Sequence, residues 1–166
     1  MEGLMSHWFV VVSKPAKEGV AQIQLENQGY DVYLPRWVEP KRRRGVFQAV
    51  AGPMFPRYLF VRPEDAEQSI APVRSTYGVS HLVRFGMTFA QASDQLVSEI
   101  RSLEARQFQT ESPMAPFKTG DIVEITEGAF RGISAKVLSC AESRVILLLE
   151  LLGKQRELQF DVNVCR

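Results

Sequence analysis

The stretch from residue 53 to residue 61, PMFPRYLFV, constrains the fold of this 166-residue chain more than any other. It is rich in aromatic side chains, contains two prolines near its start, and is followed by Arg62-Pro63. Read as an extended strand, it divides its side chains between two faces: Phe55, Arg57, Leu59 and Val61 on one, Met54, Tyr58 and Phe60 on the other. Because both faces carry large apolar groups, both need cover. We predict a core on one side, and a helix, a second domain or a partner protein on the other.

Upstream of this run, the sequence predicts a strand, a helix and a second strand. Residues 8–12 (WFVVV) are continuously apolar and rich in β-branched side chains, which favours a buried strand. Residues 17–28 carry apolar side chains at helical spacing, and Gly29 is suited to end such a helix. Residues 30–37 follow as a second strand.

Downstream, the pattern predicts a helix, a strand and a longer helix. We expect the first helix over residues 64–71, ended by Pro72, and the strand over residues 79–86, which ends at a glycine. Residues 91–107 predict the longer helix, with Ser93 as its N-cap. This order favours an α+β fold, in which a small antiparallel sheet has helices packed on one face.

A dense basic run, EPKRRRG at residues 39–45, lies between two strand-like segments and is typical of a hairpin tip. Arg42, Arg43 and Arg44 are at its centre. The charge pattern leaves two interpretations open: contact with the phosphates of DNA or RNA, or a solvated loop. Because the formal net charge of the whole chain is only +1, nucleic-acid contact would have to come from such local clusters.

The composition changes after the predicted long helix, which indicates two domains. We place an N-terminal domain at residues 1–107, a linker rich in polar residues and proline at residues 108–117, and a C-terminal domain at residues 118–166. Each domain is short, but the length of the chain allows two small ones.

The C-terminal domain gives two conflicting local signals. Alternation over residues 120–125 and 133–138, on either side of a glycine turn at residues 128–132, predicts β-strands. Residues 145–152 (VILLLELL) are dominated by leucine, a strong helix former. As a strand or as a helix, this run has too much apolar surface to face water. Such conflicts are expected at functional or switching elements.

Several classes of protein are poorly supported by the sequence. The two cysteines, Cys140 and Cys165, are too few for a disulfide framework and favour a reducing compartment. Residues 1–7 lack the pattern of a signal peptide, and no apolar run approaches the length of a membrane span. We therefore expect a soluble, cytoplasmic protein with no membrane partner.

Catalysis and metal binding have little support. His7 and His81 are isolated, with no cysteine or carboxylate cluster at ligand spacing, so we expect no metal site. Neither a nucleophile motif nor a phosphate-cradling glycine loop is present. We predict no catalytic residues and no cofactor.

Segments spread over nearly the whole chain carry a family resemblance. In the first domain these segments are WFVV (8–11), residues 53–61 and GVSHLVRFG (78–86). In the second they are TGD (119–121), ITEGAFRG (125–132) and the leucine run before Gly153-Lys154. Together they resemble the NusG family of transcription elongation factors, and VRFG with the leucine run is most similar to its RfaH branch.

The resemblance implies that the first domain has the ferredoxin-like fold of NusG N-terminal domains and binds RNA polymerase. An apolar depression in this domain would receive the tip of the paired helices of the polymerase clamp. The matching positions are Phe55, Tyr58, Phe60 and Phe85. A second contact would bridge the DNA cleft, disfavour clamp opening and suppress pausing, although residues 69–72 (SIAP) depart from the polar motif expected there. The implied function is transcription elongation and antitermination. It would act by a population shift, because a factor that binds the closed clamp better than the open clamp favours the closed one.

For the second domain, the resemblance implies a KOW-type fold with two forms. One is an SH3-like β-barrel that contacts a small-subunit ribosomal protein; the other is an α-helical hairpin docked on the polymerase-binding surface, in which state the factor is autoinhibited. The matching interdomain positions are Arg144, Ile146, Leu148, Leu149 and Leu152. Arg144 corresponds to the basic partner of an interdomain salt bridge, but Gly52 stands where the branch has the carboxylate.

The branch also contacts the non-template DNA strand of the elongation complex, and here the chain departs from it. Lys14 matches, whereas Val20, Gln24 and Tyr77 replace a basic residue, a histidine and an arginine. Contact that does not depend on sequence remains open, through these residues: Lys14, Lys17, Arg42, Arg43, Arg44 and Arg74.

A second function is compatible with the same residues. In it, the chain is a KOW-type RNA-binding or ribosome-binding module, and the first domain only supports the second. In either case we expect a monomer.

Overall fold

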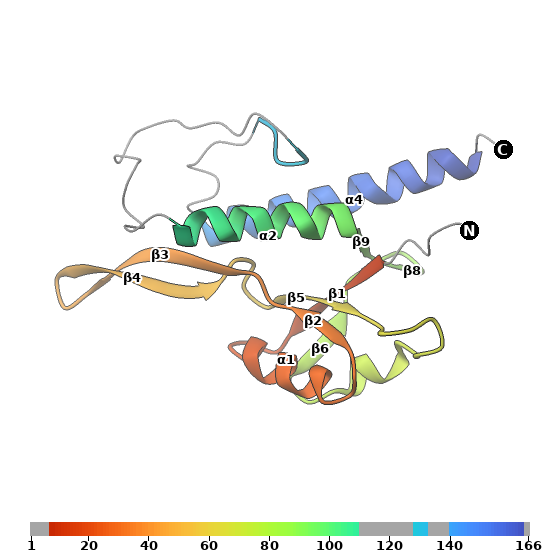
Figure 1. Ribbon diagram of the computed structural model, residues 1–166, viewed down its shortest axis with the longest axis horizontal. Helices are drawn as coiled ribbons and strands as arrows, with labels where there is room; N and C mark the ends of the chain where they lie inside the picture. The colour runs from red at the N-terminus through yellow and green to blue at the C-terminus, as the bar shows by residue number, and fades with distance from the viewer. Residues whose placement is uncertain (1–6, 110–127, 133–139, 165–166) are drawn as a thin grey trace.

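The computed structural model describes residues 7–109, 128–132 and 140–164, and its centre is an antiparallel sheet (Figure 1). The strands run in the order β2-β5-β1-β6, and β9 also pairs with β1. Their bounds are His7–Ser13 for β1, Asp31–Tyr33 for β2, Tyr58–Arg62 for β5, Val79–Leu82 for β6 and Gln91–Ser93 for β9. The strand predicted at residues 8–12 is therefore confirmed, as the central strand of the sheet.

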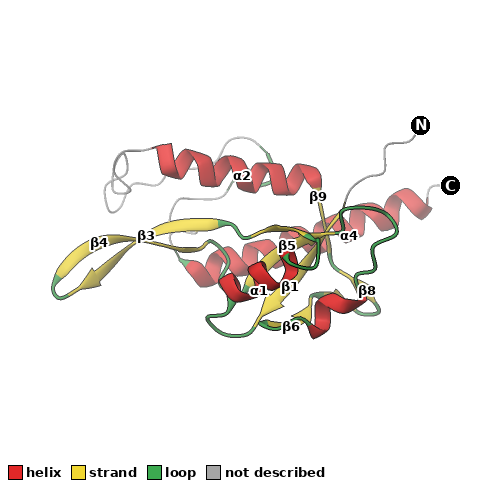
Figure 2. Ribbon diagram, turned by 60° about the horizontal axis from the view of Figure 1, so that its bottom comes forward, coloured by secondary structure: helices red, strands yellow, loops and turns green. Residues whose placement is uncertain are grey.

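Helices cover both faces of this sheet, not the single face that the sequence predicted (Figures 1 and 2). On one face, α1 (Glu18–Glu26) buries Ala21 and Leu25 in a cluster with Leu59. On the other face, α2 (Asp94–Gln109) and α4 (Ala141–Val164) contribute to a larger cluster around Phe60. The physical reason is that β1 and β5 are apolar on both sides, so one layer of helices leaves half of that surface in water.

A long hairpin projects from the sheet (Figure 1). It consists of β3 (Arg36–Arg43) and β4 (Val46–Pro53), paired from Arg36 opposite Pro53 to Arg43 opposite Val46. The turn between them has positive φ at Arg44 (51°) and Gly45 (80°), the geometry of a tight two-residue hairpin turn. The predicted hairpin with a basic tip is confirmed. The strand predicted at residues 30–37 is instead divided between β2 and β3.

The run at residues 53–61 is not one strand. Its first part ends β4, a turn follows, and β5 begins at Tyr58, whose N–H donates to the Phe55 carbonyl (2.9 Å). Arg57 in this turn has a φ of 75°, and the prolines cannot donate to a ladder. The prediction for Phe55 was therefore wrong: its side chain packs in the cluster of Phe60, not with Leu59 and Val61.

The helix predicted at residues 64–71 is also wrong. Asp65 Oδ1 accepts hydrogen bonds from the N–H groups of Glu67 (2.9 Å) and Gln68 (2.8 Å), which stabilises a turn in place of a helix. A short 3-10 helix, η1 (Ala71–Ser75), follows, and Pro72 lies near its start, where a missing N–H costs little.

The remaining elements of the first domain differ from prediction at their boundaries. The strand expected over residues 79–86 is divided into β6 and β7 (Arg84–Phe85), and β7 pairs with β8 (Thr88–Phe89). The long helix starts at Asp94, because residues 91–93 belong to β9, and it continues into the predicted linker. Ser93 Oγ accepts from the Leu96 N–H (3.2 Å), which confirms the N-cap.

In the C-terminal part, the leucine run is helical and lies in α4. Residues 128–132 form the predicted turn, with positive φ at Gly128 (82°) and Gly132 (86°). The strands predicted at residues 120–125 and 133–138 lie outside the described residues. Among the helices of the described part, none is long and apolar enough to cross a membrane.

Candidate protein-binding surface beneath helix α4

The structure brings the four predicted polymerase-binding aromatics into one cluster. Phe55 and Phe60 are buried, and their ring centroids lie 6.5 Å apart in an edge-to-face arrangement. Tyr58 and Phe85 are half-buried and pack against the same cluster. Three different elements position them, since Phe55 comes from the turn before β5, Tyr58 and Phe60 from β5, and Phe85 from β7. The aromatic cluster, as we call these four side chains, is therefore a product of the tertiary fold.

Helix α4 covers the aromatic cluster with leucines at helical spacing. Leu148 and Leu152 have exposed fractions of 0% and 1%, and Leu151 is also buried. Leu149 is partly buried against the same cluster. Ile146 is 58% exposed, so the expectation that it contacts the first domain is corrected. A helix places Ile146 about 160° away from the centre of the buried stripe, because each residue turns by roughly 100°.

Arg144 anchors the first turns of α4 to the hairpin. Its guanidinium forms an ion pair with Glu39 on β3, and its Nε donates to the Met54 carbonyl (2.7 Å). It also lies 5.4 Å from the centroid of the Trp37 ring. The side chain of Arg144 is only 2% exposed, whereas that of Glu39 is 25% exposed. A buried guanidinium needs such partners, because an unpaired charge inside a protein is costly.

Sequence reasoning did not predict that Glu39 is the ion-pair partner of Arg144. The RfaH branch has its carboxylate at the position of Gly52, and Gly52 pairs with Trp37 across the hairpin. Glu39 lies two residues further along β3, on the same face as Trp37. The signal that could have found it is the Arg44-Gly45 turn, because a two-residue turn fixes the register of the whole hairpin.

Phe130 was also missed, since its segment was interpreted only as a turn. It is 3% exposed and belongs to the same cluster as Leu148. The Ala129 N–H donates to Glu99 Oε2 on α2 (2.7 Å), which holds the turn against that helix. The turn therefore adds a second apolar contact between the C-terminal part and the first domain.

Stacked aromatic rings and guanidinium groups hold α2 on the sheet. The Arg101 guanidinium on α2 lies 4.2 Å from the Tyr33 ring centroid and 5.8 Å from the Trp8 ring centroid. Tyr33 donates to Glu104 on α2 (2.5 Å). Burial of the Tyr33 phenol raises its pKa the most, and the hydrogen bond to Glu104 raises it further. Trp8, the first residue of the predicted buried strand, is 3% exposed.

The predicted nucleic-acid residues are exposed and lie in two separate places. Lys14 and Lys17 are in the turn between β1 and α1, and Arg74 is in η1. Arg42, Arg43 and Arg44 are at the tip of the β3–β4 hairpin, which points away from α1 and η1 (Figure 1). The two groups therefore do not form one continuous patch.

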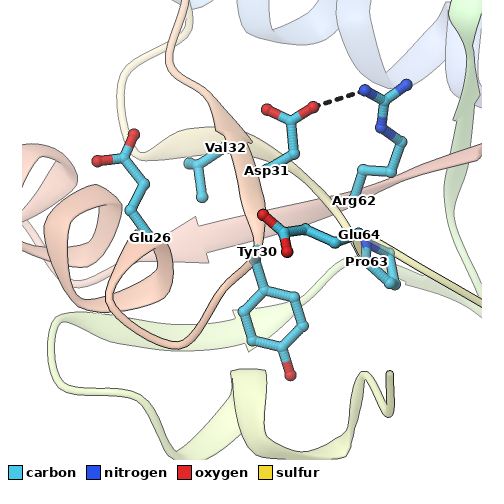
Figure 3. Close-up of a pocket in the computed structure, with 7 residues that line it drawn as sticks. All are labelled: Glu26, Tyr30, Asp31, Val32, Arg62, Pro63 and Glu64. Carbon is cyan, nitrogen blue, oxygen red and sulfur yellow. Dashed lines mark hydrogen bonds and ion pairs between the residues drawn. The ribbon is translucent and has the colours of Figure 1, made fainter. Parts of the chain in front are cut away.

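A surface hollow of about 610 Å³ lies between α1 and the edge of the sheet at β2 (Figure 3). Glu26, Asp31 and Glu64 contribute carboxylates to it, and Asp31 forms an ion pair with Arg62 (2.6 Å). Because carboxylates outnumber the single guanidinium, the hollow repels phosphate groups and is unsuited to nucleic acid.

The described residues hold no group of three or more histidine, cysteine or acidic side chains that could bind a metal ion. Cys140 is exposed at the start of α4, where hydrogen bonds from Ser143 lower the pKa of its thiol. Cys165 lies outside the described residues.

The comparisons with known proteins agree with this fold. A family model described as "Transcription termination factor nusG" matches residues 6–101, which is more than half of the chain. The chain belongs to the NusG family. Members of this family are transcription termination and antitermination factors and not enzymes.

Individual NusG proteins resemble the chain over a longer range. The "Transcription termination/antitermination protein NusG" of Streptococcus pyogenes serotype M1 is 26% identical over 125 residues, which covers 75% of this chain and 70% of the relative. The NusG proteins of serotypes M18 and M6 match with the same identity and coverage. The similarity therefore extends beyond the segment that the family model matches.

Proposed function

We propose that this chain is a transcription elongation and antitermination factor of the RfaH type, which binds RNA polymerase through its aromatic cluster. The single observation that carries the proposal is the packing of Phe55, Tyr58, Phe60 and Phe85 in one cluster beneath α4. Each aromatic side chain that a partner buries can contribute about 1.5 to 3 kcal/mol. The tip of the paired clamp helices is the partner implied by the family resemblance.

In this proposal, α4 and the polymerase compete for the same surface. The docked leucines make the chain autoinhibited, and polymerase can bind only the population in which α4 has left. Once bound, the first domain bridges the DNA cleft, favours the closed clamp and suppresses pausing. The basic residues Lys14, Lys17 and Arg74 and the hairpin tip then face the non-template DNA strand.

We further propose that residues 118–166 form the second domain after release. In that state they fold as a KOW-type SH3-like β-barrel and bind a small-subunit ribosomal protein, and residues 108–117 serve as the linker to the domain at residues 1–107. The conflict between strand and helix signals in this segment supports two folds of similar stability.

Capture by immobilised core RNA polymerase tests the proposal. Glu39→Ala leaves Arg144 buried without its carboxylate, which should destabilise docking by about 3 to 5 kcal/mol. We expect this variant to be captured more strongly than the wild type. Adding Tyr58→Ala and Phe85→Ala to the Glu39→Ala variant should remove its stronger capture, because these changes delete side chains that polymerase would contact.

Ile146→Ala is the matched control for this experiment. Ile146 is on α4 but 58% exposed, so its truncation should leave capture at the wild-type level. Capture that survives the Tyr58 and Phe85 changes undiminished would contradict the proposal. Binding to RNA or ribosomes without any capture by polymerase would favour the alternative, a KOW-type module without direct action on polymerase.

A further inference from the structure

The tip of the β3–β4 hairpin combines positive charge with exposed apolar groups. Lys41, Arg42, Arg43 and Arg44 are all exposed, and the segment KRRRGVFQ at residues 41–48 has no acidic residue. Phe47 and Val46 are 61% and 62% exposed. The hairpin carries this tip away from the sheet (Figures 1 and 2). Neighbouring apolar side chains left in water at the end of a projecting element indicate a contact surface.

Phe47 and Arg42 form a pair across the hairpin. They are direct partners in the register, and the Arg42 guanidinium lies 6.0 Å from the centroid of the Phe47 ring. Arg43 and Val46 are the next pair and belong to the opposite face. One face of the tip therefore presents an aromatic ring beside a guanidinium plane, and the other presents a cation beside a small apolar group.

The charge at the tip selects the class of partner. Four cations within four residues contrast with a net charge of +1 for the whole chain, so the partner must be strongly anionic. An aromatic ring among such cations is suited to a base, because bases stack on aromatic rings while cations hold the neighbouring phosphates. In a duplex the base faces are already stacked on one another, whereas a single strand has them free.

We infer that the hairpin tip is a binding site for single-stranded nucleic acid, in which Phe47 stacks on an unpaired base and Arg42, Arg43 and Arg44 contact phosphates. The inference rests on the proposed function for the place where such a strand is met, a transcribing polymerase. The contact itself belongs to the hairpin and does not involve the aromatic cluster. It also gives exposed Phe47 a role that packing does not explain.

Fluorescence anisotropy with the full chain tests the inference without polymerase. The probe is a labelled DNA strand of about 12 nucleotides without self-complementarity, compared with a duplex of the same sequence. We expect Phe47→Ala to weaken binding of the single strand by about fivefold to a hundredfold, the range for loss of one stacked base. Its binding to the duplex should change by less than about twofold, because duplex binding depends on phosphate contacts.

Three variants separate stacking from other contributions. Phe47→Trp should bind the single strand at least as tightly as the wild type, and its indole fluorescence should be quenched on binding. Phe47→Leu keeps an apolar side chain but should bind like Phe47→Ala. Val46→Ala removes an exposed apolar group from the opposite face and should bind like the wild type. Thermal unfolding followed by circular dichroism should be unchanged in all of them, since both side chains are exposed.

Two results would overturn the inference. One is equal affinity of wild type and Phe47→Ala for the single strand. The other is a loss in Phe47→Ala that appears for phosphatidylserine vesicles and not for DNA, which would assign the tip to an anionic membrane surface. Because no polymerase is present, failure of the aromatic cluster to bind polymerase would leave a positive result in this assay intact.

Discussion

At the scale of single residues, the packing of α4 on the aromatic cluster depends on the partners of the Arg144 guanidinium. Its guanidinium has a carboxylate from Glu39, a carbonyl from Met54 and the ring of Trp37 around it. A buried ion pair contributes little compared with an apolar pair, but removal of one partner is strongly destabilising. The pair is therefore suited to make docking specific, because α4 in any other position would leave Arg144 buried without these partners or expose it to water.

Tyr33 gives a prediction on pH dependence. Burial, and then the hydrogen bond to Glu104, raise the pKa of Tyr33 above its ordinary value. Below about pH 10 the phenol is neutral in both states, and its contribution to stability is fully present. Above that pH the unfolded chain ionises while the folded chain keeps the proton, so stability is lost as pH rises. The slope for this one group approaches about 1.4 kcal/mol per pH unit.

Urea unfolding from pH 8 upward checks this prediction. The free energy of unfolding of the wild type should fall more steeply above about pH 10 than that of Tyr33→Phe, which has no proton to lose. Comparison of the two removes the titration of other groups that they share. Equal slopes would show that burial does not hold the proton on Tyr33.

At the scale of elements, α4 has apolar side chains on its exposed face as well as on the face that packs against the aromatic cluster. Leu148, Leu151 and Leu152 are buried, while Ile146, in the same apolar run, remains 58% exposed. The helix therefore keeps apolar surface that the docked state does not use. The helical signal of this run differs from the strand signals of residues 120–125 and 133–138, as expected of a segment that takes part in a switching element.

Leu148→Ala tests the role of the buried face of α4. Removal of a fully buried leucine side chain should destabilise docking by about 2 to 5 kcal/mol and expose the aromatic cluster. We expect higher fluorescence of the dye ANS, which binds exposed apolar surface, in Leu148→Ala than in the wild type. Ile146→Ala, a matched change on the exposed face, should resemble the wild type. Equal dye binding by both variants would show that the docked leucines do not hold α4 in place.

At the scale of the whole molecule, the sheet and α4 are joined in different ways. The sheet strands are linked by continuous ladders, such as Phe9 to Val12 of β1 opposite Tyr58 to Val61 of β5. Helix α4 satisfies its own backbone and is held to the rest by side chains. Its departure would therefore break no strand pair, but it would uncover the aromatic cluster.

Hydrogen exchange of the intact chain should report this difference. We expect the backbone amides of α4 to exchange faster than those of β1 and β5, because α4 can open locally while the sheet stays folded. Glu39→Ala should increase exchange in α4 and leave the strands unchanged. Simultaneous exchange of α4 and β1 in the wild type would contradict this picture, since it would mean that the two parts open only together.

Most elements that are continuous in sequence were predictable. The central strand, helix α1 and the hairpin follow from local periodicity and from Gly29 and Gly45 at their ends. The four aromatics and Arg144 were found through resemblance to a family. The roles of Glu39 and Phe130 were not predicted. That of Glu39 depends on the register of the hairpin, and both depend on contacts between segments far apart in the chain.

The sequence by itself determined that this chain has more apolar surface than one domain face can hide, and that its leucine run must be covered. Only the tertiary structure decided what covers it: the run lies in a helix whose Leu148, Leu151 and Leu152 pack on the aromatic cluster, with Glu39 as the partner of Arg144. The physical reason is that the hydrophobic effect is non-directional and does not specify which segment of the chain covers an apolar surface. Local patterns fix which residues avoid water, whereas the partner that excludes water is chosen by the geometry of the whole molecule.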